Sequence, residues 1–260
     1  MKTKAIIRIV IYSLLFVMLT GLLLGGLGIG YFIRNLSSGN ANGSGERTTT
    51  VRQVDSGEYS NLSIEWAAGS VKIVTGYNDK IIIKETRDTS VTSAMITEFE
   101  GNTLKIRYGS NFAFHFGSLQ SKDLLIILPK EWVCRKLEID GAALDIDISG
   151  VTIDRMELNG ASTELSFNGS VTELECNGAA AKMSMTCTSS PRNISLDGAA
   201  CELTLDLPKD CGFVVDSDGV AIDIRSGHAY EVINGKYCYG DEYCKIDVSG
   251  VGCKVTVDPS

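Results

Sequence analysis

The chain has 260 residues and a formal net charge of −8, with 44% hydrophobic and 22% charged residues. That apolar content excludes a mainly disordered chain, and the length allows one large domain or two small ones. The acidic balance argues against a nucleic-acid-binding protein, because no basic patch is available to displace counterions from phosphates. With two histidines, a histidine-rich metal site or a histidine-based catalytic array is not expected.

The first predicted element is a membrane-spanning helix over residues 9–33, a stretch without charged residues. It exceeds the roughly 20 residues that cross the hydrocarbon core and the roughly 7–15 apolar residues of a cleavable signal peptide. We interpret residues 1–34 as a cytoplasmic tip and uncleaved signal anchor, with a cleaved signal as the alternative. Basic residues at positions 2, 4 and 8 precede the span. The positive-inside rule therefore predicts a single-pass cell-membrane protein whose C-terminal part is extracytoplasmic.

Glycines in this span favour helix association. Gly21, Gly25 and Gly28 share one helix face, and small residues at such spacing let two helices approach closely. Glycine is common in membrane helices, which accounts for the pattern; the alternative is a homodimer through the transmembrane glycine face.

Residues 35–57 are rich in Gly, Ser, Asn and Thr and are predicted to be a flexible linker that reaches roughly 25 Å. From Asn61 onward, apolar and polar residues alternate in short runs such as LSIEW, KIIIKE and DLLIILP. Such alternation predicts β-strands. Residues 58–130 are expected to form an N-terminal β-strand part, and no later stretch has a helical period, so the exterior is predicted to be all-β.

The second half of the chain, residues 131–260, repeats itself. Similar segments begin at Leu137, Met156, Leu174, Ile194, Phe213 and Ile246. The repeat is about 19 residues long, except for the last step, which contains an insertion at residues 227–243. Repeats of this length must stack to bury a core, which is typical of a solenoid.

The pattern inside one repeat predicts a coil of two strands. Leu137 and Ile139 share one face, Leu144 and Ile146 share another, and the alternation changes phase at Gly141. A phase change indicates a corner, where glycine supplies the positive φ that a corner often needs. We therefore expect a parallel β-solenoid whose coils stack in chain order at about 4.8 Å.

The sequence resembles a bacterial family in four features. These are an N-terminal anchor, strand repeats, an LPK segment ending at Lys130 and stacked coils with a [DN]-G-A corner. This family is the "putative adhesin" β-strand-repeat family, a domain of unknown function found in envelope proteins. The resemblance covers residues 55–258. It implies a β-solenoid, an envelope setting and no known catalytic residues.

Polar residues recur at the corners of the repeats: Asp140, Asn159, Asn177, Asp197 and Asp216. Such a column could supply calcium ligands, since hard cations prefer oxygen. It could equally be a ladder of side chains hydrogen-bonded at each corner. The nine-residue repeat of calcium-binding β-rolls is absent, so the ladder is favoured and no metal or cofactor is assigned.

Two further columns are acidic and should face outward. One contains Glu138, Glu157 and Glu175, and the other contains Asp145, Glu164 and Glu202, interrupted by Lys182. They could attract cations or basic groups, including amines of wall polymers, or simply be solvated. Paired carboxylates also serve glycosidases, but acids that recur at every coil favour an architectural role, and no catalytic residue is assigned.

Eight cysteines fall in a part of the chain where disulfides are permitted. Cys238 and Cys244 flank a short segment of the insertion, and a hairpin there would join them, so they are the candidate disulfide. Cys201 and Cys253 share a column, but the coil starting at Phe213 is expected to lie between them. That would separate them by about 9.6 Å, too far for a bridge.

Two aromatic surfaces are candidate binding sites. The first is the run Phe112, Phe114, His115 and Phe116, which could otherwise be a core strand. The second consists of tyrosines in the insertion: Tyr230, Tyr237, Tyr239 and Tyr243. Tyrosine-rich loops on rigid scaffolds suit binding.

The predicted function is a non-enzymatic, membrane-anchored binding or scaffold module of the cell envelope, with a cell-wall polymer or envelope protein as partner. The resemblance implies an accessory role in envelope-stress or wall systems. The alternatives are a surface adhesin for an external glycan or protein, and a carbohydrate-active β-helix enzyme.

Overall fold

The computed structural model describes residues 46–109 and 121–259. The chain divides into two units between residues 45 and 46, and the second unit is described below. Among the described residues, no helix qualifies as a membrane-spanning segment. The span predicted over residues 9–33, with its glycine face, lies outside them.

The second unit is built almost entirely from strands, which confirms the all-β class. It contains one 3-10 turn, η1 (Ser56–Glu58), and the following strands: β1 (Arg47–Asp55), β2 (Asn61–Glu65), β3 (Ala68–Gly76), β4 (Lys80–Asp88), β5 (Ile96–Glu100), β6 (Thr103–Arg107), β7 (Lys122–Pro129), β8 (Val133–Cys187), β9 (Asn193–Ala199), β10 (Cys201–Leu207), β11 (Phe213–Val220), β12 (Asp223–Arg225), β13 (Glu231–Ile233), β14 (Lys236–Tyr239), β15 (Cys244–Val251) and β16 (Lys254–Pro259).

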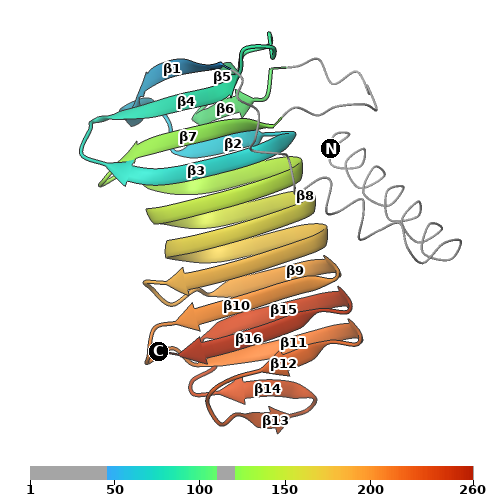
Figure 1. Cartoon of the computed structure of the whole chain (residues 1–260). Coiled ribbons are helices and arrows are strands. Elements are labelled where there is room, and N and C mark those ends of the chain that lie inside the picture. Colours follow the sequence, from blue (N-terminus) through green and yellow to red (C-terminus); the bar gives the residue numbers. More distant parts are fainter. Residues whose placement is uncertain (1–45, 110–120, 260) are drawn as a thin grey trace, which may run out of the picture. The chain divides into compact units, whose positions relative to one another are not determined.

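The strands sort into two layers by their pairing with β8, which runs without interruption through several repeats (Figure 1). In the first-strand layer, β2 pairs in parallel with residues 136–140 of β8 and β9 pairs with residues 173–178. In the second-strand layer, β3 pairs with residues 143–149 and β10 with residues 181–186, again in parallel. Each repeat thus contributes one strand to each layer, as the phase change predicted.

The core lies between the two layers. The inward positions predicted from the alternation are buried, with Leu137, Ile139, Ile146 and Ile148 each at most 1% exposed. Because alternate residues of a strand face opposite sides, the residues between them face solvent. The outer surfaces of the two layers therefore carry the charged and hydroxyl side chains.

Most corner glycines are required because successive corners pack closely, and not because the backbone has a positive φ there. A Cβ on Gly198 would lie 1.9 Å from the carbonyl oxygen of Gly178, and one on Gly250 would lie 1.7 Å from that of Gly198. Gly178 and Gly198 have no positive φ, whereas Gly250 (137°) and Ala200 (60°) do. The expectation that corner glycines are needed for positive φ is therefore wrong for most coils, since their role is to let successive corners touch.

The expected stacking of coils in chain order is wrong at both ends of the stack. At the N-terminal end, β2 and β3 lie between β6 and β7 on one side and the first coil of β8 on the other. At the C-terminal end, the last coil is out of order as well. β15 pairs in parallel with β9 on one side and with β11 on the other. β16 likewise pairs with both β10 and β12. The last coil, which we call the intercalated coil (residues 244–259), therefore lies between two coils that precede it in the sequence (Figure 1). A parallel ladder joins backbone groups, so its hydrogen bonds do not depend on chain order.

The linker expected at residues 35–57 ends earlier than predicted. Residues 47–55 form β1, which pairs antiparallel with β4 from Arg47 opposite Asp88 to Asp55 opposite Lys80. The Thr-rich sequence was interpreted as a tether, but threonine is β-branched and favours strands. The remainder of that linker, up to residue 45, lies outside the described residues.

A buried ion pair near β1 was not foreseen from the sequence. The Lys122 ammonium, which is fully buried, donates to Glu85 Oε1 at 3.0 Å and to the carbonyl oxygens of Ser93 and Tyr108 at 2.7 and 2.6 Å. Its Nζ also lies 4.1 Å from the centroid of the Tyr108 ring. Burial lowers the pKa of Lys122, while Glu85 opposes that shift. Lys122 and Glu85 lie on different strands, β7 and β4, and no sequence motif joins them.

Candidate functional site

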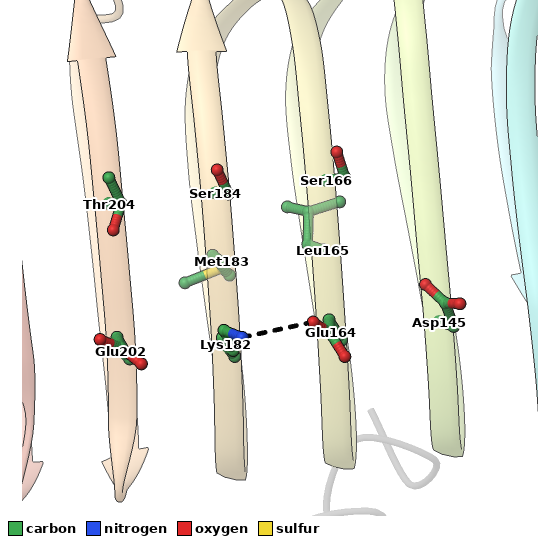
Figure 2. A pocket seen from close by; sticks show the side chains of 9 residues that line it. All are labelled: Asp145, Glu164, Leu165, Ser166, Lys182, Met183, Ser184, Glu202 and Thr204. Carbon is green, nitrogen blue, oxygen red and sulfur yellow. Dashed lines mark ion pairs between the residues drawn. The ribbon is translucent and has the colours of Figure 1, made fainter. Parts of the chain in front are cut away.

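An open pocket of about 540 Å³ lies on the outer surface of the second-strand layer. Its lining comes from four neighbouring strand segments: Asp145, Glu164, Leu165, Ser166, Lys182, Met183, Ser184, Glu202 and Thr204. Figure 2 shows the charged side chains in one row across these segments and the hydroxyl side chains in a second row beside it. We call this surface the charged-row pocket.

The parallel register holds the row together. Glu202 of β10 is paired with Lys182 of β8 on one side and with Lys254 of β16 on the other. At the opposite end of the pocket, Asp145 is paired with Ser70 of β3. The residues lie in line because each coil places the same repeat position at the same height. The sequence predicted this column and its interruption by Lys182.

From Glu164 to Lys254 the charges of the row alternate, and they form two ion pairs. Lys182 Nζ lies 3.6 Å from Glu164 Oε1, and Lys254 Nζ lies 2.9 Å from Glu202 Oε1. The hydrogen bond from Lys254 lowers the pKa of Glu202. The row is therefore not the repelling stack of acids that a simple column of carboxylates would make.

Asp145 differs from the other acids of the row. Within the described part of the chain it makes no ion pair. Partial burial raises its pKa, and the nearby carboxylates Glu164 and Asp147 raise it further. This end of the pocket is the most negative part of the row and is suited to a cationic group.

The hydroxyl row was missed in the sequence. Ser166, Ser184 and Thr204 each follow the charged row by two positions, so they face the same side of the layer. Thr204 is paired with Thr256 of β16, which continues the row. Each hydroxyl can both donate and accept a hydrogen bond. The signal was present as a recurring Ser or Thr two residues after the acid or lysine.

The other acidic column, on the first-strand layer, is neutralised. Glu157 is 7% exposed and lies 2.9 Å from both Lys136 Nζ and Arg155 Nε. Arg155 also reaches Glu173 at 3.4 Å and Glu175 at 2.9 Å. These acids therefore belong to a salt-bridge network and leave little free charge for a ligand.

The corner column forms a hydrogen-bonded ladder of side chains. Asn159 Nδ2 donates to Asp140 Oδ1 at 2.8 Å, and Asn177 Nδ2 donates to Asn159 Oδ1 at 3.1 Å. Burial raises the pKa of Asp140 to about 6, against the opposing effect of the bond from Asn159. No metal-binding group of three or more ligands occurs among the described residues.

The tyrosines of the insertion are divided between the core and the surface. Tyr237 and Tyr239 are half-buried against the core, and Tyr239 stacks on Phe213 with ring centroids 5.4 Å apart. Tyr230 and Tyr243 are 37% and 46% exposed. The four thus do not form one exposed surface. The other aromatic candidate, the run Phe112, Phe114, His115 and Phe116, lies outside the described residues.

The prediction that a hairpin brings Cys238 and Cys244 together is wrong. The hairpin of the insertion pairs β13 with β14 around Asn234 and Gly235, an Asn-Gly turn of the kind that closes two-residue hairpins. Cys238 is paired with Val214 and Cys244 with Phe213, so β11 lies between the two cysteines. Two strand spacings are about 9.6 Å, beyond the range of a disulfide. Both cysteines are free and buried.

No family model matches the chain, and no curated protein matches it significantly. Several solved structures are similar to it. One, a putative cell adhesion protein from Clostridium sporogenes, is 12% identical over 83% of this chain and 100% of that chain, with a TM-score of 0.49. Putative adhesins from Bacteroides fragilis (9%, covering 81% and 97%, TM-score 0.45) and Parabacteroides distasonis (11%, covering 84% and 98%, TM-score 0.41) are also similar. Their names agree with the resemblance noted from the sequence, and the function proposed below rests on this chain's own residues.

Proposed function

We propose that this chain is a non-enzymatic binding or scaffold module of the bacterial cell envelope. Residues 9–33 would hold it in the membrane, with the second unit outside the cytoplasm as a parallel β-solenoid. Its ligand would be a cell-wall polymer that carries hydroxyl and amine groups, bound in the charged-row pocket. The two-strand repeat and its parallel register support the solenoid, and the apolar run in the sequence supports the anchor.

The observation that carries this proposal is the pair of rows in the charged-row pocket. Charges and hydroxyls repeat along the stack at the strand spacing, so a polymer lying across the strands could contact each coil in turn. The unpaired Asp145 beside Glu164 suits an amine, while Ser166 and Ser184 can donate to and accept from sugar hydroxyls. An open pocket also accepts a chain that continues beyond it at both ends.

The state of Glu202 supports binding over glycan cleavage by this residue. A glycosidase needs one carboxyl group that is protonated near neutral pH to act as a general acid. Glu164 and Glu202 are each paired with a lysine, and the pKa of Glu202 is lowered. With its pKa lowered, Glu202 is ionised near neutral pH and cannot supply that proton.

The test is co-sedimentation of the full chain, held in detergent micelles, with isolated bacterial cell wall. We expect saturable pelleting that does not require added Ca²⁺. The double variant Asp145→Asn and Glu164→Gln should bind about fivefold more weakly, a change of about 1 kcal/mol. The matched control is Glu175→Gln, which alters an exposed, ion-paired glutamate on the other layer and should leave binding unchanged.

Three results would contradict the proposal. Absence of pelleting would remove the wall as the ligand, and equal binding by the double variant would remove the charged-row pocket as the site. Release of soluble sugar that disappears in Glu164→Gln and Glu202→Gln would show an enzyme instead of a binding module.

A further inference from the structure

The intercalated coil carries a cysteine at the start of each of its two strands. Cys244 is the first residue of β15, and Cys253 directly precedes β16. Both are buried, with 0% and 1% of their surface exposed. The last coil of the sequence thus brings two buried thiols between two coils that precede it.

Cys253 lies directly against a cysteine of β10. Glu202 is opposite Lys254 in a parallel pair of strands, so the preceding residues, Cys201 and Cys253, face each other across one strand spacing. That spacing of about 4.8 Å is within the range of Cα separations that a disulfide spans. The expectation that the coil starting at Phe213 lies between Cys201 and Cys253 is wrong, because β16 of the intercalated coil pairs directly with β10.

These two thiols are free in the structure and lie in the hydrophobic core. Cys201 is 3% exposed and Cys253 is 1% exposed. Burial raises the pKa of Cys201 to about 12, and the neighbouring Cys253 thiol contributes to the shift. Two thiols this close, shielded from water, are poor nucleophiles once the coil is seated, so any bond between them must form as the coil docks.

We propose that Cys201 and Cys253 are oxidised to a disulfide that locks the intercalated coil into the stack. The thiolate of one cysteine attacks a low-molecular-weight or protein disulfide, giving a mixed disulfide and releasing one thiol. The second thiolate then displaces the other thiol and forms the Cys201–Cys253 bond. The two thiol protons pass through solvent to the two thiols that are released, and the two electrons reduce the disulfide of the partner.

The position of the bond gives it a specific structural effect. The loop between Cys201 and Cys253 contains β11, β12 and the β13–β14 hairpin. Closing this loop restricts the unfolded chain and keeps β16 from leaving its place beside β10. Without β15 and β16, the edges of β9, β10 and β11 would be open to pairing with other chains.

The experiment is refolding of the full chain in detergent with a mixture of reduced and oxidised glutathione, followed by non-reducing peptide mapping. We expect a cross-linked peptide pair containing Cys201 and Cys253. Reduction before refolding should lower the melting temperature by about 8 °C, as expected for a loop of this length in a unit of this size.

The matched variants are Cys253→Ala and Cys134→Ala, which remove equally buried thiols. Cys253→Ala should abolish the cross-link and the effect of reductant on the melting temperature, and Cys134→Ala should retain both. A refolded chain in which Cys201 and Cys253 remain free, or in which Cys201 is cross-linked to another cysteine, would overturn the proposal. So would a melting temperature that reductant leaves unchanged in both the unaltered chain and Cys134→Ala.

Discussion

The regular coils of β8 and the C-terminal coils share one repeat motif but not one stacking order. Along β8, each coil follows its sequence neighbour and pairs with it. After β10, the chain forms β11 and β12 and then the β13–β14 hairpin. The last two strands, β15 and β16, lie between the coil of β9 and β10 and the coil of β11 and β12. The comparison shows that the motif specifies how a coil pairs, while it leaves open which coil is the partner.

The corner glycines show why both arrangements are compatible with the same motif. In the regular part, Gly178 is opposite Gly198. In the C-terminal part, Gly250 is opposite Gly198 on one side and Gly219 on the other. Any coil with a glycine at this corner can pack on any other, because the contact is between backbone atoms.

Deletion of residues 244–260 should have the largest effect, because it removes the strands on which β11 and β12 pair. We expect residues 213–243 to lose hydrogen-exchange protection, while the regular coils keep theirs. Hydrogen exchange with mass spectrometry on the full chain and the deletion variant measures this. Unchanged protection of residues 213–243 would mean that β11 can pair directly with β9, so that the stacking order is adaptable.

Replacing a corner glycine by alanine should destabilise the fold more in the intercalated coil, at Gly250, than in β8, at Gly160. Gly250→Ala should lower the free energy of unfolding by about 3 kcal/mol, because the Cβ would meet the Gly198 carbonyl oxygen and the φ is positive. Gly160→Ala should cost about 1 kcal/mol, since its closest contact is the Thr163 side chain, which can rotate, and the nearest backbone oxygen is 3.2 Å away.

Urea unfolding monitored by circular dichroism measures both glycine variants. Gly57→Ala is the control, because nothing lies within 4 Å of its Cβ and its φ is not positive; it should change stability by less than about 0.5 kcal/mol. Equal costs for Gly250→Ala and Gly160→Ala would remove the distinction between the two corners.

The side-chain ladder of the regular coils predicts a pH effect. The pKa of Asp140 is raised to about 6, so the folded chain binds more protons than the unfolded chain between about pH 4 and 6. This contribution to stability is present at low pH and is lost as pH rises through 6. Asp140→Asn should therefore be more stable than the unaltered chain at pH 7, by up to about 3 kcal/mol, and equal to it near pH 3.

Urea unfolding of both chains across this pH range measures the effect. Asparagine keeps an oxygen that can accept the bond from Asn159, so the ladder itself is retained. A variant whose stability follows the same pH profile as the unaltered chain would show that Asp140 is not the group responsible.

Surface charges should have the smallest effect in either region. Arg155→Ala in the regular coils should cost about 0.5–1 kcal/mol, because one half-exposed guanidinium serves three glutamates. Lys254→Ala in the intercalated coil should cost less than about 0.5 kcal/mol, since it breaks one exposed pair. Both costs should shrink in urea titrations at high salt, and a larger cost for Lys254→Ala would reverse the ranking.

The candidate site could be predicted in part from the sequence. The charged row of Asp145, Glu164, Lys182 and Glu202 was visible as a column, because the repeat length fixes which residues align. Its pairing was not visible, since Lys254 enters from a coil that the sequence places elsewhere. The burial of Lys122 against Glu85 was likewise hidden, because the two residues lie on different strands with no motif joining them.

The sequence by itself determined the all-β class, the two-strand repeat, the inward residues and the column of charges. These follow from local periodicity, which depends only on residues a few positions apart. The tertiary structure alone decided the order of the coils and the pairing of residues 47–55 as a strand. It also decided that Cys201 and Cys253 lie opposite each other on neighbouring strands. The physical reason is that backbone hydrogen bonds in a parallel ladder are the same for every partner, so only the packing of the whole unit selects one.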